Sequence, residues 1–142
     1  MKEIREVIES KAALMQKGDA EAILSYYAPT VVEYNLAPPL RQPGDRPSLT
    51  GLREWMAGFE APPRREVTRL EITTDGDVAF ATSIDCMSAV PRGATESFTL
   101  WYRVTTGLRR IDGRWLVTHE HQSVPFEMDG SFRASTGLTP TD

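Results

Sequence analysis

The sequence contains little cysteine, no long apolar run and no excess of positive charge, and each shortage excludes a class of protein. Its 142 residues include a single cysteine, Cys86, which has no partner for an intrachain disulfide and no second thiol for a zinc site. This favours a reducing compartment. No segment approaches the roughly 18 consecutive apolar residues that span a membrane, and residues 1–6 are largely charged. The sequence therefore predicts a cytoplasmic protein with no membrane contact.

Acidic residues outnumber basic ones along the chain. There are 16 lysines and arginines against 20 aspartates and glutamates, a formal net charge of −4, and the two signs are interspersed. The chain thus lacks the basic stripe that neutralises nucleic-acid phosphates, and we expect no nucleic-acid partner. With 40% hydrophobic and 25% charged residues, its composition is that of a single globular domain that can bury its own core.

The spacing of apolar residues changes along the chain from a helical period to a strand period. Helical spacing occurs in residues 2–17, from Asp19 to Pro29, and from Ser48 or Thr50 to Pro62. A β-prone run at residues 31–36 and a proline-rich loop separate the second and third of these segments. From residue 65 the period is two, which predicts strands near residues 65–74, 77–89, 95–111 and 114–124.

This order of elements, α-α-β-α-β-β-β-β, indicates an α+β fold. Helices gathered near one end of the chain and antiparallel strands near the other imply a sheet with one face covered by the three helices. We expect one domain over residues 1–127. Residues 128–142 are expected to form a C-terminal tail.

The turn between the last two predicted strands decides which side chains face the helices. If Asp112-Gly113 forms a two-residue hairpin turn, Ile111 lies opposite Arg114 and Val104 opposite His121. Side chains alternate along a strand. The more apolar face, expected to pack on the helices, then carries Tyr102, His119, His121 and Ser123. The outer face carries Trp101, Arg103, Leu116 and Glu120, a set suited to a homodimer contact. A four-residue turn would reverse this assignment.

Four stretches of the sequence together resemble one family. They are Leu36-Ala37-Pro38-Pro39-Leu40, the helix from Leu52 to Glu60, the strand from Gly76 to Ala81, and the run from Arg110 to Trp115 followed by His119 to Phe126. In this order they are similar to the SnoaL-like, or ketosteroid-isomerase-like, branch of the NTF2-like superfamily. The resemblance implies a cone of three helices wrapped by a curved, mainly antiparallel sheet, a pocket inside the cone, and usually a homodimer through the sheet.

The resemblance does not imply one reaction, because a single fold hosts many functions. The steroid isomerases of the superfamily hold an oxyanion with a tyrosine and a protonated aspartate, and they use another aspartate as the base. The positions that correspond to these residues are Lys11, Gly107 and Asn35. None of the three has the required side chain, so steroid isomerisation by that mechanism is not expected.

The two histidines, His119 and His121, are the first candidates for catalysis. A histidine changes its protonation near neutral pH and serves as a general acid or base, and the resemblance to SnoaL-type cyclases also implies such a group on the last strands. The alternative is that both are hydrogen-bonded packing residues. Their H-x-H spacing suits a metal ion as well, but the chain has no third histidine, and no metal site is predicted.

Lys11 and Asp85 are further candidates for acid–base chemistry. Lys11 lies in the apolar stripe of the first predicted helix, where burial would lower its pKa and make it a base, a Schiff-base nucleophile or an anchor for an anion. The alternative is an amine that extends to solvent from the margin of the stripe. Asp85 shares a strand face with Ser83, either as a pocket base or as a solvated side chain. Tyr102 and Tyr27 are the candidate hydrogen-bond donors.

A larger set of residues is expected to line the pocket, although aromatic residues at helical spacing are more often core. The set is Tyr27, Tyr34, Asn35, Trp55, Phe59, Phe80, Ser83 and Ser123. The sequence thus predicts a pocket for a small hydrophobic or carbonyl compound and no cofactor. The protein is either a cofactor-free isomerase, cyclase, dehydratase or hydrolase, or a non-catalytic ligand-binding or dimerisation module.

Overall fold

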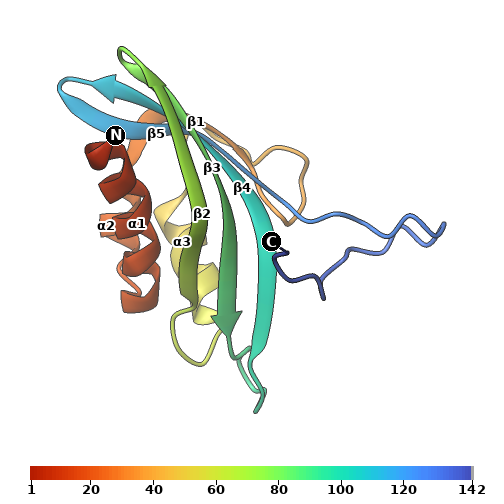
Figure 1. The fold of residues 1–142 in the computed structure, drawn as a ribbon. Coiled ribbons are helices and arrows are strands. Elements are labelled where there is room, and N and C mark those ends of the chain that lie inside the picture. Colours follow the sequence, from red (N-terminus) through yellow and green to blue (C-terminus); the bar gives the residue numbers. More distant parts are fainter. Residues whose placement is uncertain (142) are drawn as a thin grey trace.

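The computed structural model describes residues 1–141, which form three helices packed against one curved, five-stranded sheet (Figure 1). The helices are α1 (Lys2–Lys17), α2 (Ala20–Leu24) and α3 (Leu49–Ala57). The strands are β1 (Tyr27–Tyr34), β2 (Arg64–Asp75), β3 (Val78–Ala89), β4 (Phe98–Ile111) and β5 (Arg114–Ser123). The predicted α+β class and order of elements are therefore confirmed.

The hairpin of α1 and α2 forms where the sequence predicts a break between helices. Gly18 ends α1 in the left-handed region, with φ at 69°, which glycine adopts without steric cost. Asp19 then caps α2 by accepting a hydrogen bond from the amide of Ala22 at 3.1 Å. α2 ends at Leu24, well before the predicted boundary, because the chain from Tyr27 onward joins the sheet as β1.

The sheet is mixed, with the strand order β1-β5-β4-β3-β2. Strands β2 to β5 form consecutive antiparallel pairs, with bounds close to the predicted ones. β1 instead lies parallel to β5 at one edge of the sheet. β5 is therefore flanked on both sides, and its inward side chains are covered by neighbours from two strands.

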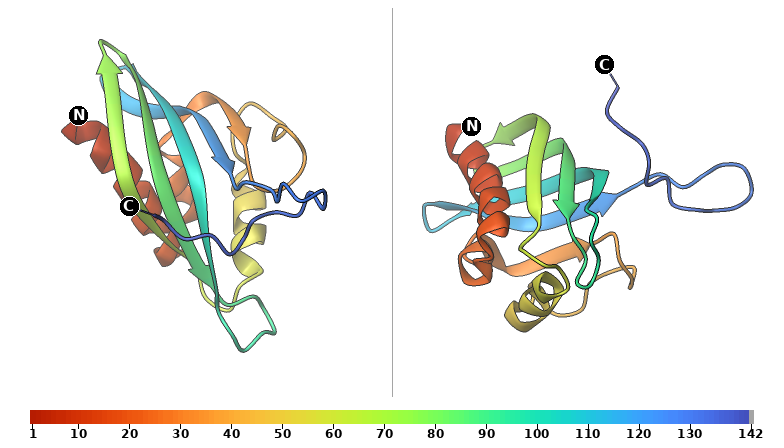
Figure 2. Two further views of the ribbon diagram at one scale, coloured as in Figure 1. Left: turned by 45° about the vertical axis from the view of Figure 1, so that its right-hand side comes forward. Right: turned by 90° about the horizontal axis from the view of Figure 1, so that it is seen from below.

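The core lies between the sheet and the helices, mainly α1 and α2, and α3 contributes Met56 to it. Ile4 and Ile8 of α1 belong to one buried cluster with Leu108 of β4 and Val117 of β5, and none of these side chains is more than 7% exposed. Figure 2 shows α1 packed along the sheet and α3 in a separate position. Among residues 1–141, no helix is both long enough and apolar enough to cross a membrane.

A β-bulge interrupts the pairing of β4 with β5. Next to the turn, Ile111 lies opposite Arg114, as predicted. Further along, the register shifts so that Gly107 pairs with His119, which leaves Thr118 as the extra residue. Gly107 permits this close approach, because a Cβ atom at that position would lie only 3.2 Å from the Cβ of His119.

The bulge inverts the predicted inner and outer faces of the second half of β5. Val104 pairs with Gln122 rather than with His121. Glu120 consequently points inward and is 2% exposed, whereas His121 is exposed. The prediction that both histidines face the helices is wrong, and so is the prediction that Glu120 belongs to the outer face.

After β5 the chain leaves the sheet. Residues 124–136 extend away from the rest of the molecule on the side opposite α1 and α2 (Figures 1 and 2). The last described residues return toward β2, where the Arg69 guanidinium donates a hydrogen bond to the carbonyl of Thr141. The C-terminal segment is thus attached to the sheet at two separate strands.

Candidate functional site

Buried polar side chains gather on the inner face of the sheet, opposite α1. The Lys11 ammonium nitrogen of α1 lies 2.9 Å from a carboxylate oxygen of Glu120 on β5 and 3.0 Å from the phenolic oxygen of Tyr27 on β1. The Tyr27 hydroxyl donates to the same Glu120 oxygen at 3.0 Å. The three residues are at most 8% exposed. They form a closed triangle of hydrogen bonds in the interior of the protein.

Arg65 of β2 connects this triangle to a second carboxylate. Its guanidinium lies 2.8 Å from Asp85 on β3 and 3.4 Å from the other carboxylate oxygen of Glu120. Ser83 donates to Asp85 at 2.7 Å, and Gln122 donates to Glu120 at 2.8 Å. We call the group of Lys11, Tyr27, Arg65, Asp85 and Glu120 the interior cluster.

The interior cluster holds two cations and two carboxylates, so its formal charges cancel. Removing an ion from water costs several kcal/mol, a cost that only close pairing offsets. Although burial favours the protonated form of Glu120, Lys11 and Arg65 hold the pKa of Glu120 well below its usual value. Burial lowers the pKa of Lys11, and the contact with Glu120 opposes that change. Glu120 is therefore ionised at neutral pH.

Two tyrosines complete the polar interior. Burial raises the pKa of Tyr27 well above its usual value, and the neighbouring Glu120 adds to the rise. Burial also raises the pKa of Tyr102, whose ring centre lies 5.7 Å from the Arg65 guanidinium. Both phenols consequently stay protonated at neutral pH and remain hydrogen-bond donors.

Glu33 of β1 is a further carboxylate beside the interior cluster. It pairs with Glu120 in the parallel register of β1 and β5, and it is half-buried. Burial first, and then repulsion from Glu120, raise the pKa of Glu33 to about 7, while attraction to Lys11 opposes the rise. Glu33 can therefore gain or lose a proton near neutral pH, whereas Glu120 stays ionised.

Five of the side chains singled out from the sequence lie in this region. Ser83, Asp85 and Tyr102 point inward from the sheet, as the alternation predicts, and each is at most 7% exposed. Lys11 and Tyr27 meet them from α1 and β1. Lys11 is 6% exposed, so the alternative prediction, an amine that extends to solvent, is wrong.

Sequence reasoning missed Arg65, Glu33 and the inward direction of Glu120. A signal for Glu120 was present in Gly107, because a glycine inside a strand marks a bulge or a close backbone approach. Arg65 and Glu33 carry no such signal. Arg65 occupies an inward position on β2, whose many other charged residues are typical of a solvated sheet, and Glu33 is the one charged residue of β1.

The two histidines lie on the opposite face of the sheet, away from the interior cluster. The ring of Tyr34 stands edge-on to both, with ring centroids 5.2 Å from His119 and 5.3 Å from His121. His119 Nδ1 lies 2.7 Å from the carbonyl oxygen of Val32. These contacts place Tyr34 and the histidines together on the outer surface, so the expectation that they line an interior pocket is wrong.

Phe80 and Ser123 also differ from the expectation for pocket residues. Phe80 is 52% exposed on the outer face, and the Ser123 hydroxyl accepts a hydrogen bond from the exposed Arg103 at 3.1 Å. Trp55 and Phe59 lie at the end of α3, with ring centroids 5.1 Å apart. Asn35 follows the end of β1 and is half-buried.

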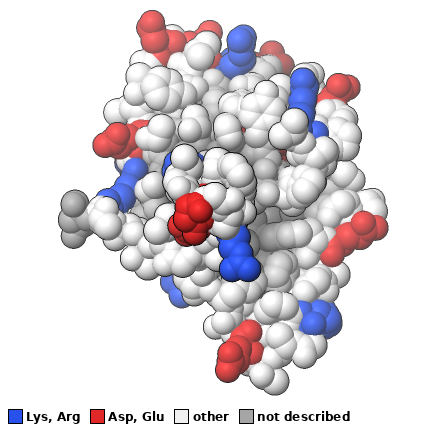
Figure 3. Space-filling view, turned by 90° about the vertical axis from the view of Figure 1, so that its right-hand side faces the viewer, with Lys and Arg blue, Asp and Glu red and all other residues white. Residues whose placement is uncertain are grey.

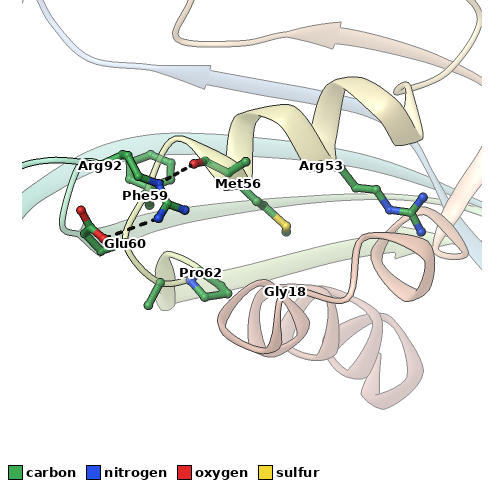
Figure 4. A pocket seen from close by; sticks show the side chains of 9 residues that line it. Gly18, Arg53, Met56, Phe59, Glu60, Pro62 and Arg92 are labelled. Carbon is green, nitrogen blue, oxygen red and sulfur yellow. Dashed lines mark hydrogen bonds and ion pairs between the residues drawn. The ribbon is translucent and has the colours of Figure 1, made fainter.

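A shallow groove of about 290 Å³ lies elsewhere on the surface, between the end of α3 and the turn after α1. Figure 4 shows Arg92 and Glu60 paired on one wall, with nitrogen and oxygen 3.6 Å apart. Gly18, Met56 and Pro62 contribute other walls. No member of the interior cluster lines this groove, so the two sites are separate.

In the part of the chain that the structure describes, no group of three or more histidine, cysteine, aspartate and glutamate side chains is placed to hold a metal ion. Figure 3 shows charges of both signs scattered among wide uncharged areas on the side from which the C-terminal segment extends. On that face the charged side chains are dispersed, whereas those of the interior cluster lie within hydrogen-bonding distance of one another.

Comparison with known proteins assigns the family. The model of the SnoaL-like domain matches residues 4–127. An NTF2-like protein of unknown function from Pseudomonas putida KT2440 is 30% identical, and the match covers 98% of this chain and 95% of that chain with a TM-score of 0.84. The chain belongs to the SnoaL-like domain family and has the NTF2-like fold. The comparison with curated proteins finds no match.

More distant solved structures share the fold. A candidate scytalone dehydratase from Novosphingobium aromaticivorans DSM 12444 is 12% identical, with 100% of this chain and 95% of that chain covered and a TM-score of 0.78. An NTF2-like superfamily protein from Salmonella enterica serovar Typhimurium LT2 is 18% identical, with 92% and 94% covered and a TM-score of 0.73. At these identities the likeness establishes the fold alone.

Proposed function

We propose that this protein is an enzyme that transfers a proton on a small carbonyl-bearing molecule, with Glu33 as its acid and base. The observation that carries this proposal is the position of Glu33, a half-buried carboxyl group in register with the ionised Glu120 at the margin of the interior cluster. A carboxyl group in this position meets solvent or a ligand on one side, while the buried charges set its protonation from the other.

The proposed reaction requires one exchangeable proton. In its carboxylate form Glu33 removes a proton from the carbon next to a carbonyl group, which leaves an enolate. Glu33 then returns that proton to a different carbon, which gives an isomer, or to a departing hydroxyl group, which gives a dehydrated product and water. The carboxyl group carries the proton itself, so this course needs no metal or cofactor.

The interior cluster acts in this proposal by setting charges. Glu120 raises the pKa of Glu33, and Lys11 provides positive charge close enough to oppose that rise. The same ammonium group favours the negative charge that develops on an enolate. Lys11 and Glu120 are therefore positioning residues, while Arg65 and Asp85 hold the cluster together. The distant likeness to a candidate scytalone dehydratase supports dehydration as one of the reactions to test.

The test measures proton exchange and works before the natural substrate has been identified. A panel of small cyclic ketones and enones is incubated with the protein in D₂O, and loss of the α-proton signals is followed by ¹H NMR. We expect exchange of at least one compound, a loss of roughly 10²–10⁴-fold in the Glu33→Gln variant, and no loss in His121→Gln. Equal rates in wild type and Glu33→Gln would contradict the assignment of Glu33.

A non-catalytic binding module is the second candidate, and one observation favours it. Among residues 1–141, every buried side-chain nitrogen and oxygen atom has a hydrogen-bond partner within the protein. A polar interior that is satisfied in this way stabilises one packing without any reaction. Such a module would bind members of the same panel, seen as chemical-shift changes at interior residues, without exchanging their protons.

Two copies are proposed to pair through the outer face of the sheet, the face opposite α1 and α2. Trp101 and the exposed Arg103 lie on it, together with the exposed apolar side chains of Val78 and Phe80. Glu120, expected there from the sequence, is absent from this surface because it points inward. Partly apolar sheet faces of this kind are usually covered in the working protein.

A further inference from the structure

Residues 125–136 form an arm that is folded on itself rather than on the body of the protein. Phe126 and Ala134 form an antiparallel bridge. The amide of Glu127 donates to the carbonyl of Arg133 at 2.6 Å, and the hydroxyl of Ser135 donates to the Glu127 carboxylate at 3.0 Å. These bonds give the arm a defined hairpin-like shape (Figures 1 and 2).

The arm exposes large apolar side chains. Phe126 is 48% exposed, Met128 87% and Phe132 75%. Only the two phenylalanine rings meet each other, with centroids 5.5 Å apart. Phe132 also has a positive φ of 57°, a strained conformation for a bulky residue that persists only when the surroundings hold it. The few bonds within the arm do not bury these side chains, so another surface is needed to cover them.

The charges of the arm indicate which surface could cover its apolar side chains. The arm carries Glu127 and Asp129 against one basic residue, Arg133. The outer faces of β4 and β5 carry the exposed Arg103 and Arg109 and no carboxylate, because Glu120 is the only acidic residue in either strand and points inward. The arm extends away from its own sheet (Figure 2). Residues 137–141 pass on the outer side of the sheet to reach Arg69 of β2, yet Phe80 and Arg103 of the outer face stay exposed. The acidic, apolar arm itself faces outward and does not cover them.

We propose that the arm binds a second copy of this chain, lying across the outer faces of that copy's β3, β4 and β5, so that two copies exchange arms. The exposed side chains of Met128 and Phe132 pack in this arrangement against apolar residues such as Phe80. This inference rests on the proposed pairing of two copies through the outer sheet face, and it specifies that the arm of one copy, rather than its sheet, makes that contact. It adds that the arms hold the pair together.

The first experiment separates pairing from arm exchange. Sedimentation equilibrium of the full chain is compared with that of the double variant Met128→Ser/Phe132→Ser, with Leu40→Ser as the control, because Leu40 is 98% exposed in a loop outside the arm. We expect a wild-type dimer, a dissociation constant at least about 10-fold higher in the double variant, and no change in Leu40→Ser. A wild-type monomer at 100 μM overturns both proposals, whereas a dimer unaffected by the arm substitutions overturns arm exchange alone.

The second experiment locates the contact. Phe132 is replaced by the photoreactive p-benzoylphenylalanine, and equal amounts of ¹⁵N-labelled and unlabelled protein are mixed and irradiated. We expect cross-linked peptides that join a labelled arm to unlabelled β3, β4 or β5, and the reverse. Cross-links confined to a single isotope, or directed to the helices of the other copy, would contradict the proposed contact.

Discussion

The ammonium group of Lys11 on the first helix lies 2.9 Å from the carboxylate of Glu120 on the last strand, and both side chains are almost entirely buried. This ion pair connects the beginning of the chain to its final strand inside the core. It also sets the electrostatic surroundings of Glu33, so one contact bears on both stability and proposed chemistry.

Removing only one partner of this ion pair should strongly destabilise the folded protein. We expect Lys11→Met to lower the free energy of unfolding by about 3–5 kcal/mol, because it leaves Glu120 buried without its nearest cation. Urea denaturation measures the change. The control is Arg53→Met, which removes an exposed pair with Glu21 whose atoms lie 3.2 Å apart and should cost less than about 1 kcal/mol. If both variants lowered the free energy of unfolding by a similar amount, the buried pair would contribute no more to stability than an exposed one.

The stability of the protein should depend on pH through Glu33. Its pKa is raised from 4.5 to about 7, so between these values the folded state binds more protons than the unfolded state, and the free energy of unfolding falls as the pH rises. In the Glu33→Gln variant the free energy of unfolding should no longer fall over this pH range. Urea denaturation of both proteins between pH 4.5 and 8 measures it, and parallel curves would contradict the shift.

Glu120 should act in the opposite direction at lower pH. Its pKa is held below the usual value of 4.5, so its stabilising contribution is present above that value and is lost as the pH falls below it. We therefore expect acid destabilisation below about pH 4.5 in wild type and equally in Glu33→Gln. In Glu120→Gln this acid-dependent loss should be reduced. If Glu120→Gln lost as much stability at low pH as wild type, other carboxylates would be the cause of the acid destabilisation.

The elements of the fold were predictable because their signals are local. The helical spacing of α1, the Gly18-Asp19 break and the alternation in β2 to β5 depend on nearby residues only. The sequence does not predict which side chains of β5 point inward, because this depends on a single extra residue at the bulge. A shift of one residue turns every later side chain to the other face of the sheet. The parallel partner of β1 also depends on residues far apart in sequence.

The bulge itself can be tested at Gly107. We expect Gly107→Ala to lower the free energy of unfolding by about 1–3 kcal/mol, the usual cost of added volume at a packed position, since the new methyl group would lie 3.2 Å from the Cβ of His119. Gly137→Ala, which has open space around it, is the matched control. If the two variants were equally stable, the register of β4 with β5 would have to be different.

The outward position of the histidines predicts their reactivity. His121 is exposed, whereas His119 is half-buried with Nδ1 at 2.7 Å from the Val32 carbonyl. Diethyl pyrocarbonate should therefore modify His121 before His119, and complete modification of His121 should leave the proton exchange proposed for Glu33 unchanged. Mass spectrometry of peptides measures the order. Loss of that proton exchange on modification of His121 would show that the histidines take part in the reaction.

The central claim is that Glu33 titrates near neutral pH beside a Glu120 that stays ionised at that pH. ¹³C NMR of side-chain carboxyl groups, assigned with Glu33→Gln and Glu120→Gln, measures both titrations in one series. We expect a midpoint for Glu33 near pH 7 and no protonation of Glu120 until well below its usual pKa. A Glu33 midpoint at its ordinary value of 4.5 would contradict the account.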